Sequence, residues 1–371
     1  MKKSIFLLLP ILLTGCGNNA ITHTPGDDLI IVMNEMVQEY GECFIIKYGD
    51  YEIVVDSGTG AENNIIKSNL AKYCTDNVID LLVITHPHGD HIGGFNNGLF
   101  NNYSITNLVD FGYTYVTDGD DEISSPYIYN RYAQERTELI MNGTTYTPIT
   151  DALKQGKVKI SDEDYLSLEW LKNDYYFEYG TTFPNSSVSQ TNPNITSVCF
   201  NLSYKNWNFL FMGDADSTYT ETSIMKNHQK LYNDKNARVA LKATHHASST
   251  SLGTSFLRWS KAESVFCSAA MIDDICAPNQ VQLGSREGYQ NHPNRSTVKR
   301  IKNHLESLSS NQFYWNGING TLKITCDGVN DLTYFGDGRS KNYLIKNSTE
   351  EANIELEKHI SFFESEFNKY F

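Results

Sequence analysis

A short run of polar residues directly after an apolar segment restricts this chain more than any other feature. Residues 79–84 are apolar apart from Asp80 and have the length of a buried strand. The four potential metal ligands that follow within six residues are His86, His88, Asp90 and His91. In an extended chain the first two point to the same side, and the other two follow a turn where a helix can begin. One segment can therefore serve two adjacent metal positions. Imidazole with carboxylate suits zinc, and also manganese or iron.

The segment from Thr85 to Gly94 reads Thr-His-Pro-His-Gly-Asp-His-Ile-Gly-Gly. It resembles the H-x-H-x-D-H signature of metallo-β-lactamase-fold hydrolases, in particular the hydrolase domain of the ComEC competence-protein family and its secreted relatives. This resemblance implies an α/β (α+β) fold, the four-layer αββα sandwich. It also implies a metal-dependent hydrolase that binds one or two zinc ions, or manganese in their place.

Two later segments are similar to the same family. Asn194-Ile-Thr-Ser197 precedes an expected strand, and a second strand at 207–212 ends in Gly213-Asp214. This layout resembles the family's N-x-x-S and F-L-F-x-G-D segments, which implies that Asp214 is a carboxylate shared by two metals.

A further expected strand, 238–244, runs into His245, His246, Ala247 and Ser248. These residues resemble the family's usual H-H-G-S, with alanine in place of glycine. The resemblance implies that His245 is a ligand of the second metal, together with Asp90, His91 and Asp214. His246 and Ser248 are expected to lie behind the ligands or to contact the substrate. Either histidine of the pair can be the ligand.

Asp56 and His292 are the outlying members of the expected site. Asp56 ends a strand in an Asp-Ser-Gly sequence, and the resemblance implies that it orients a ligand; the alternative is a plain turn. His292 lies in Asn-His-Pro before an expected helix at 297–308. The resemblance implies that His292 contacts the substrate or transfers a proton, a role that Asp90 can share. The alternative is an exposed turn.

No histidine occurs between His91 and His228, where many family members place a third ligand of the first metal. That metal position would then rest on His86, His88 and the shared carboxylate, with help from an aspartate such as Asp110 or from water. The segment at about 100–190 is rich in tyrosine. It is interpreted as an insertion that forms a substrate wall, or as ordinary packing.

Independently of any family, Asp56, His86, Asp214 and His245 each follow a strand-like run within a few residues. Side chains at strand ends converge on one edge of a sheet, so these residues are expected to meet. The hydrolase domain is placed at 29–345, followed by an amphipathic helix at 346–371 that can pack on the domain or on a second copy.

The N-terminus has the layout of a secretory signal peptide. Lys2 and Lys3 precede an apolar run at 5–13 that is too short to span a bilayer, and Leu13-Thr-Gly-Cys16 resembles the bacterial lipobox. This resemblance implies cleavage before Cys16, lipidation of its thiol and a bacterial membrane anchor facing outward, with 17–28 as a tether. The alternative is ordinary cleavage.

The six other cysteines lack a C-x-x-C spacing, and the sequence does not decide whether they pair.

Charge then separates the candidate functions. The formal net charge is −14, and it becomes −16 without Lys2 and Lys3, which argues against binding to nucleic acid. The favoured function is an extracytoplasmic phosphodiesterase or related esterase acting on a small-molecule or cell-wall phosphoester. The alternatives are a ComEC-type nuclease and a metal-binding surface lipoprotein without turnover. The sequence does not decide the oligomeric state.

Overall fold

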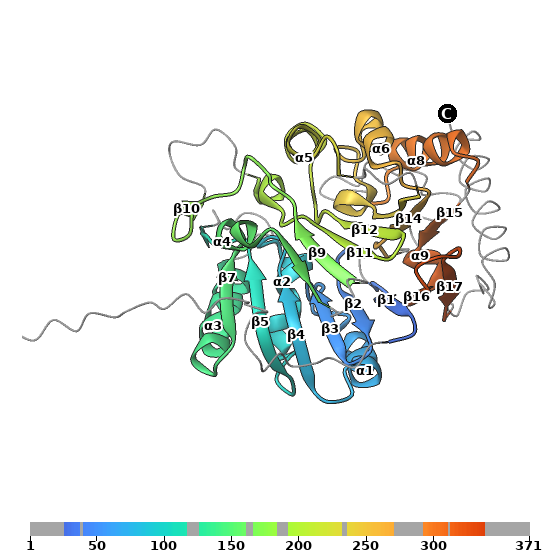
Figure 1. The fold of residues 1–371 in the computed structure, drawn as a ribbon. Helices are drawn as coiled ribbons and strands as arrows, with labels where there is room; N and C mark the ends of the chain where they lie inside the picture. Colours follow the sequence, from blue (N-terminus) through green and yellow to red (C-terminus); the bar gives the residue numbers. More distant parts are fainter. Residues whose placement is uncertain are drawn as a thin grey trace, which may run out of the picture.

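The computed structural model describes residues 26–37, 40–116, 126–160, 166–183, 192–231, 236–270, 292–310 and 312–337. These residues form two large sheets (Figure 1). The first, in the order β17-β16-β1-β2-β3-β4-β5-β7, consists of β1 (Leu29–Met33), β2 (Phe44–Tyr48), β3 (Tyr51–Val55), β4 (Val78–Val83), β5 (Ser104–Asp110), β7 (Thr145–Pro148), β16 (Leu322–Cys326) and β17 (Thr333–Gly336).

The second sheet has the order β15-β14-β13-β12-β11-β9-β8. Its strands are β8 (Lys157–Lys159), β9 (Leu166–Trp170), β11 (Phe200–Tyr204), β12 (Trp207–Phe211), β13 (Arg238–Lys242), β14 (Ser264–Cys267) and β15 (Gln312–Trp315). The short strands β6 (Thr114–Tyr115) and β10 (Thr182–Phe183) form a separate parallel pair.

The helices complete the architecture. The α-helices are α1 (Asn63–Tyr73), α2 (Gly89–Ile92), α3 (Pro126–Met141), α4 (Ile149–Ala152), α5 (Thr220–Asn227), α6 (Thr254–Ser260), α8 (Arg295–Ser307) and α9 (Asn316–Asn319). The 3-10 helices are η1 (Gly93–Asn97), η2 (Leu153–Gln155), η3 (Pro193–Thr196) and η4 (Thr244–Ala247).

The two sheets pack face to face through aromatic side chains. Phe44 of β2 meets Phe211 of β12 edge to face, with ring centroids 5.3 Å apart, and Tyr48 lies 5.3 Å from Tyr204 by the same measure. Strand β12 shows the alternation that this packing requires, because Phe211 joins the core between the sheets whereas Leu210 joins the core under the helices.

Helices cover the outer faces of both sheets. Figure 1 shows α1 on one side of the sandwich and α5, α6 and α8 on the other. The second group packs on the second sheet through Ile224, Phe256 and Ile301, which are fully buried. The layers therefore run helix, sheet, sheet, helix, and the predicted αββα sandwich is confirmed.

Parallel strands at the centre of each sheet bring the polar residues together. Strands β3, β4 and β5 are parallel in the first sheet, and β12, β13 and β14 are parallel in the second. Their carboxyl ends therefore lie at one edge of each sheet, as in other parallel α/β arrangements. Asp56 and His86 follow strands of the first sheet, and Asp214 and His245 follow strands of the second.

The segment at about 100–190 is not a single insertion. It supplies β5 and β7 to the first sheet and β8 and β9 to the second, so much of it belongs to the sandwich. Helix α3 is attached through Asp110, at the end of β5. The carboxylate of Asp110 accepts hydrogen bonds from Tyr132 (2.6 Å), Tyr146 (2.7 Å) and Arg136 (2.7 Å). Asp110 therefore anchors α3. None of the hydrogen bonds described for its carboxylate involves an expected metal ligand.

Several expectations lie outside the described residues: the signal peptide, Cys16, most of the tether, Cys276 and the C-terminal helix. In the part of the chain that is described, no helix is long and apolar enough to cross a membrane. The five described cysteines are buried free thiols: Cys43, Cys74, Cys199, Cys267 and Cys326.

Candidate metal centre

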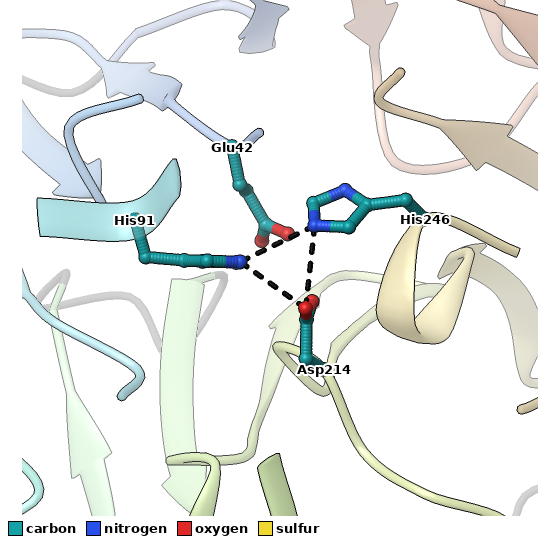
Figure 2. Close-up of side chains that lie close together, drawn as sticks. All are labelled: Glu42, His91, Asp214 and His246. Atoms are coloured by element: carbon teal, nitrogen blue, oxygen red, sulfur yellow. Dashed lines mark hydrogen bonds and ion pairs between the residues drawn. The ribbon is translucent and has the colours of Figure 1, made fainter. Parts of the chain in front are cut away.

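Four side-chain atoms from both sheets meet at the shared edge. They are Oδ2 of Asp90, Nε2 of His91, Oδ2 of Asp214 and Nε2 of His246. Asp90 Oδ2 lies 3.3 Å from His91 Nε2 and 3.2 Å from His246 Nε2. Asp214 Oδ2 lies 3.3 Å from each of these two nitrogens, which are 3.3 Å from each other (Figure 2). We call these four residues the primary group.

These separations fit a tetrahedral metal ion. Ligand atoms bound to zinc at about 2.0–2.1 Å in a tetrahedron lie about 3.3–3.4 Å from one another. Both carboxylate oxygens of Asp90 are buried and accept no hydrogen bond from the described residues, which is costly unless an ion or water is present. Two imidazoles and two carboxylates are also a donor set that divalent metals favour. The primary group can therefore hold a metal ion.

Asp56 and Thr85 set the orientation of His91. Nδ1 of His91 lies 2.7 Å from Oδ2 of Asp56, and the carboxylate also accepts bonds from the amide and hydroxyl of Thr85, both at 2.7 Å. Because a carboxylate can only accept, Nδ1 of His91 carries a proton and Nε2 faces the primary group, where it can bind a metal. Asp56 thus lies behind a candidate ligand, and its φ of 58° places it in a tight left-handed turn.

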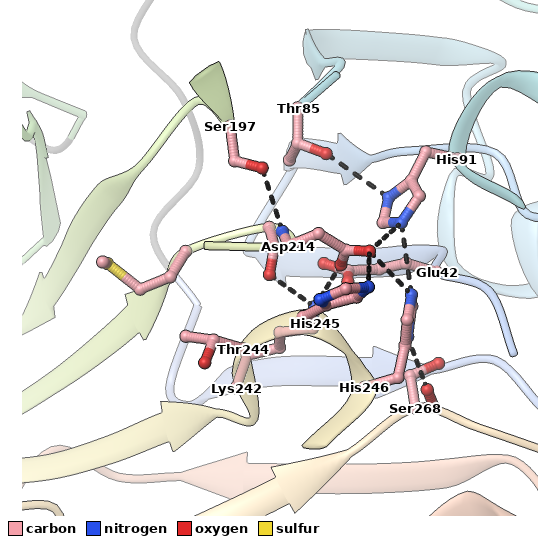
Figure 3. Close-up of polar contacts among 12 residues, drawn as sticks. Glu42, Thr85, His91, Ser197, Asp214, Lys242, Thr244, His245, His246 and Ser268 are labelled. Atoms are coloured by element: carbon pink, nitrogen blue, oxygen red, sulfur yellow. Dashed lines mark hydrogen bonds and ion pairs between the residues drawn. The ribbon is translucent and has the colours of Figure 1, made fainter. Parts of the chain in front are cut away.

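His246 is oriented in the same way by a backbone carbonyl. Its Nδ1 donates to the carbonyl oxygen of Ser268, at 2.7 Å, so Nε2 is available to a metal (Figure 3). The structure thus reverses the roles expected for the histidine pair, because His246 rather than His245 lies in the primary group. The cause is backbone geometry. His245, His246 and Ala247 have φ of 47°, 49° and 59°, a left-handed turn that does not follow strand alternation.

The left-handed turn is held by a buried carboxylate on α5. Glu221 accepts hydrogen bonds from the hydroxyl of Thr244 (2.8 Å) and from the amides of Leu252 (2.6 Å) and Gly253 (2.9 Å). Left-handed backbone costs roughly 1–3 kcal/mol at each non-glycine residue, so it needs such support. The conformation at Ala247 also accounts for the glycine that the family usually has there.

A second set of nitrogens surrounds the same oxygen of Asp214. Oδ2 of Asp214 lies 3.9 Å from Nε2 of His86 and 3.7 Å from Nε2 of His245. Nδ1 of His88 is 3.1 Å from Nε2 of His86, so three imidazoles from two segments gather on this side. We call His86, His88 and His245 the secondary group. His245 thus adds a third imidazole beside His86 and His88, although the sequence has no histidine between His91 and His228.

Two residues of the Asn194–Ser197 segment support this arrangement. The backbone amide of Asp214 donates to the hydroxyl of Ser197 at 3.0 Å, which fixes the start of the turn (Figure 3). The side-chain nitrogen of Asn194 lies 3.2 Å from Nε2 of His245. The buried Asn194 therefore borders the secondary group.

Charge and burial shift the titration of the ligands in opposite directions. Burial opposes the charge on Asp214, but His246 and His91 more than offset it and hold the pKa of Asp214 well below its usual range. Burial also opposes a charge on His91, yet Asp214 and Asp90 raise its pKa well above the ordinary value. Burial lowers the pKa of His245 to about 4. Asp214 therefore stays ionised and gives the primary group the negative charge that a cation site requires.

His292 and Ser248 lie next to these groups. The ring of His292 is 5.1 Å from that of His245 and 4.7 Å from that of Tyr40, measured between centroids. The hydroxyl of Ser248 lies 3.3 Å from that of Thr250, and its carbonyl accepts from Thr297. The ring of His292 is also 5.9 Å from that of His246, so His292 borders both groups, whereas Ser248 belongs to the supporting loop.

Sequence reasoning missed Glu42 and Lys242. A carboxylate oxygen of Glu42 lies within 4.8 Å of the ligand atoms of His91, Asp214 and His246 (Figure 2). Lys242 forms an ion pair with it, and both side chains are fully buried. The available signal was a lysine within the apolar run at 238–244. Glu42 precedes β2 and carried no such signal.

Comparison with known proteins finds one family model that matches part of the chain. The family model described as the metallo-beta-lactamase superfamily matches residues 37–99. This part of the chain, which includes Asp56, His86 and His91, is therefore similar to that superfamily.

Several solved structures are distantly similar to the chain. A metallo-β-lactamase-fold protein, YhfI from Bacillus subtilis, is 12% identical with a TM-score of 0.40, covering 78% of this chain and 96% of that one. BJP-1, a subclass B3 metallo-β-lactamase of Bradyrhizobium japonicum, is 14% identical with a TM-score of 0.31, covering 73% and 86%. A diphosphatase of the PhnP family is 11% identical with a TM-score of 0.34, covering 64% and 85%. No curated protein matches the chain.

Proposed function

We propose that the protein is a zinc-dependent phosphodiesterase or related ester hydrolase. The observation that carries the proposal is the position of one atom, Oδ2 of Asp214. It lies 3.3 Å from His91 and His246 on one side, and 3.9 Å and 3.7 Å from His86 and His245 on the other. A carboxylate oxygen placed between two groups of imidazoles suits two metal ions side by side.

When bound, such a pair of ions would supply a nucleophile from water at neutral pH and stabilise both oxygens of an in-line displacement at phosphorus. The residues of this chain would hold the ions and orient the substrate. Asp90, His91, Asp214 and His246 would hold one ion. His86, His88 and His245, with the shared Asp214, would hold the other.

Proton transfer is assigned to groups at the border of the ligand set. The ring of His292 lies against His245 and also against Tyr40, outside the buried primary group. A histidine there can donate a proton to a leaving group. Asp90 has an oxygen that is not directed at His91 or His246, and it can accept a proton from the attacking water.

The location belongs to the same proposal. The lysine pair, the apolar run and Cys16 support a lipid-anchored protein on the outer side of a bacterial membrane. The substrate would then be a small-molecule or cell-wall phosphoester outside the cytoplasm. Radiolabelled fatty acid should be incorporated by the wild-type chain but not by a Cys16→Ala variant.

The activity can be tested with four substrates in parallel. These are bis-p-nitrophenyl phosphate, p-nitrophenyl phosphocholine, plasmid DNA and single-stranded DNA, each after chelation and after adding back zinc or manganese. The Asp214→Asn variant is the control, because it removes the shared charge and should lose both metal and turnover.

Metal-dependent cleavage of a small diester, with DNA left intact, would support the proposal. Cleavage of DNA would favour the nuclease instead. If all four substrates remain intact while metal binds at the expected stoichiometry, the phosphodiesterase assignment fails.

A further inference from the structure

A buried ion pair lies directly against the primary group. Nζ of Lys242 contacts Oε2 of Glu42, and neither side chain is exposed to solvent. Lys242 is the last residue of β13 in the second sheet, and Glu42 lies just before β2 in the first sheet. The pair therefore links the two sheets at the edge where the ligands meet.

The ammonium group of Lys242 has three neighbours: the carboxylate of Glu42, the carbonyl oxygen of Gly213 and the carboxylate of Asp214. Its Nζ donates to the carbonyl oxygen of Gly213 at 2.9 Å and lies 3.5 Å from Oδ1 of Asp214. The two oxygens of Asp214 are therefore divided between different partners. Oδ1 faces the ammonium group, whereas Oδ2 faces the imidazoles of both groups.

Glu42 is tied in turn to the first sheet's ligand segment. Its backbone amide donates to the carbonyl oxygen of Asp90 at 3.1 Å, and its own carbonyl accepts from Gly58 at 2.8 Å. Its second carboxylate oxygen is buried and has no hydrogen-bond partner among the described residues. Burying a charge without a partner is costly, so the ammonium of Lys242 is the group that makes this carboxylate tolerable.

We propose that Glu42 and Lys242 form an internal charge pair that sets the affinity of the primary group for its metal, because the ammonium group of Lys242 offsets part of the negative charge of Asp214. Lys242 acts at Oδ1 and leaves Oδ2 of Asp214 to the metal. The inference deepens the proposed metal site and rests on it, but it is independent of the substrate.

The charge pair predicts effects of opposite sign. Lys242→Met removes a positive charge from beside Asp214, so the more negative site should bind Zn²⁺ about tenfold or more tightly. Glu42→Gln removes a negative charge and leaves Lys242 paired with Asp214 alone, so Zn²⁺ affinity should fall by about tenfold or more. The double variant restores the charge balance, and its affinity should lie within about threefold of the wild type.

A competing explanation is that Glu42 itself is a ligand, because its oxygen lies close to those of the primary group. The double variant separates the two explanations. If Glu42 is a ligand, the double variant stays as weak as Glu42→Gln. If Glu42 acts through Lys242, neutralising the lysine restores binding.

The experiment is a Zn²⁺ titration of the full-length chain and the three variants against a chromophoric chelator. Thermal unfolding in EDTA provides a second readout, and Lys242→Met should lower the midpoint most, because it leaves Glu42 buried without its cation. Lys47→Met is the matched control, since Lys47 contacts Glu52 in the β2–β3 hairpin at the far end of β3 from Asp56. It should leave Zn²⁺ affinity unchanged.

Opposite shifts in the single variants with recovery in the double variant would support the inference. It is overturned if Lys242→Met weakens Zn²⁺ binding, or if the double variant is no tighter than Glu42→Gln. If Lys242→Met alone does not fold, the comparison of Glu42→Gln with the double variant decides. A wild-type chain that binds no Zn²⁺ would overturn the metal site itself, which is a distinguishable result.

Discussion

Nδ1 of His91 and Oδ2 of Asp56 are 2.7 Å apart, and both side chains are completely buried. Asp56 directly follows β3, whereas His91 lies in α2, which comes after the neighbouring parallel strand β4, and the bond directs Nε2 of His91 at the primary group. A carboxylate in this position both fixes the imidazole and increases its basicity toward a metal. The orientation of the metal centre therefore depends on a residue that does not reach the metal.

Replacing Asp56 by Asn should weaken metal binding without unfolding the protein. Asparagine has the same shape and tolerates the left-handed φ of 58° found here. It lacks the charge, so Zn²⁺ affinity should fall by about 10- to 100-fold. Competition with a chelator measures the change. Asp76→Asn, an exposed turn residue after α1, is the control, and equal affinities for the two variants would contradict the role given to Asp56.

The two adjacent histidines should respond differently to alanine. His246→Ala removes an atom of the primary group and should abolish tight metal binding there, whereas His245→Ala should retain one ion. Metal content after dialysis, measured by mass spectrometry, and the visible spectrum of the Co²⁺-loaded variants distinguish the two cases. The reverse pattern would restore the assignment expected from the sequence.

Arg136 should stabilise the fold without affecting the metal. It donates at 2.7 Å to the fully buried Asp110, so Arg136→Met leaves that carboxylate without its cation. We expect a loss of about 3 kcal/mol in the free energy of unfolding. Urea denaturation measures it, with Zn²⁺ affinity as the internal control. A loss below about 1 kcal/mol would show that Tyr132 and Tyr146 suffice to hold Asp110.

Glu221 should make stability depend on pH. Burial raises its pKa to about 7, although bonds from Gly253 and Thr244 act in the opposite direction. A carboxyl whose folded-state pKa is raised binds more protons when folded, so its contribution to stability falls as pH rises from about 4.5 to 7. The total change is about 3 kcal/mol. Glu221→Gln has no such titration, so its stability relative to wild type should improve from pH 5 to pH 8.

Urea midpoints of both proteins at several pH values measure this difference. Glu263→Gln is the control, because Glu263 lies at the surface and pairs with Arg238. A constant difference between wild type and Glu221→Gln across the range would contradict the expected titration.

Much of the fold and part of the site follow from local sequence patterns. Hydrophobic alternation and turn residues predicted the strands that carry Asp56, His86 and Asp214, with boundaries within a few residues of those observed. The ligand segment from His86 to His91 is contiguous, so its residues necessarily lie close together. The same reasoning interpreted residues 100–190 as an insertion or as ordinary packing, and it did not assign their strands to the two sheets, because short edge strands such as β7 and β8 carry little periodic signal.

The sequence by itself determined the αββα class and which strand ends carry the polar residues, since both depend on periodicity and on short-range spacing. Only the tertiary structure decided that His246 rather than His245 joins Asp90, because three left-handed residues turn the chain there. It also decided the pairing of Glu42 with Lys242, which are 200 positions apart. Their contact exists because two sheets pack face to face, and no local pattern records which side chains meet across that interface.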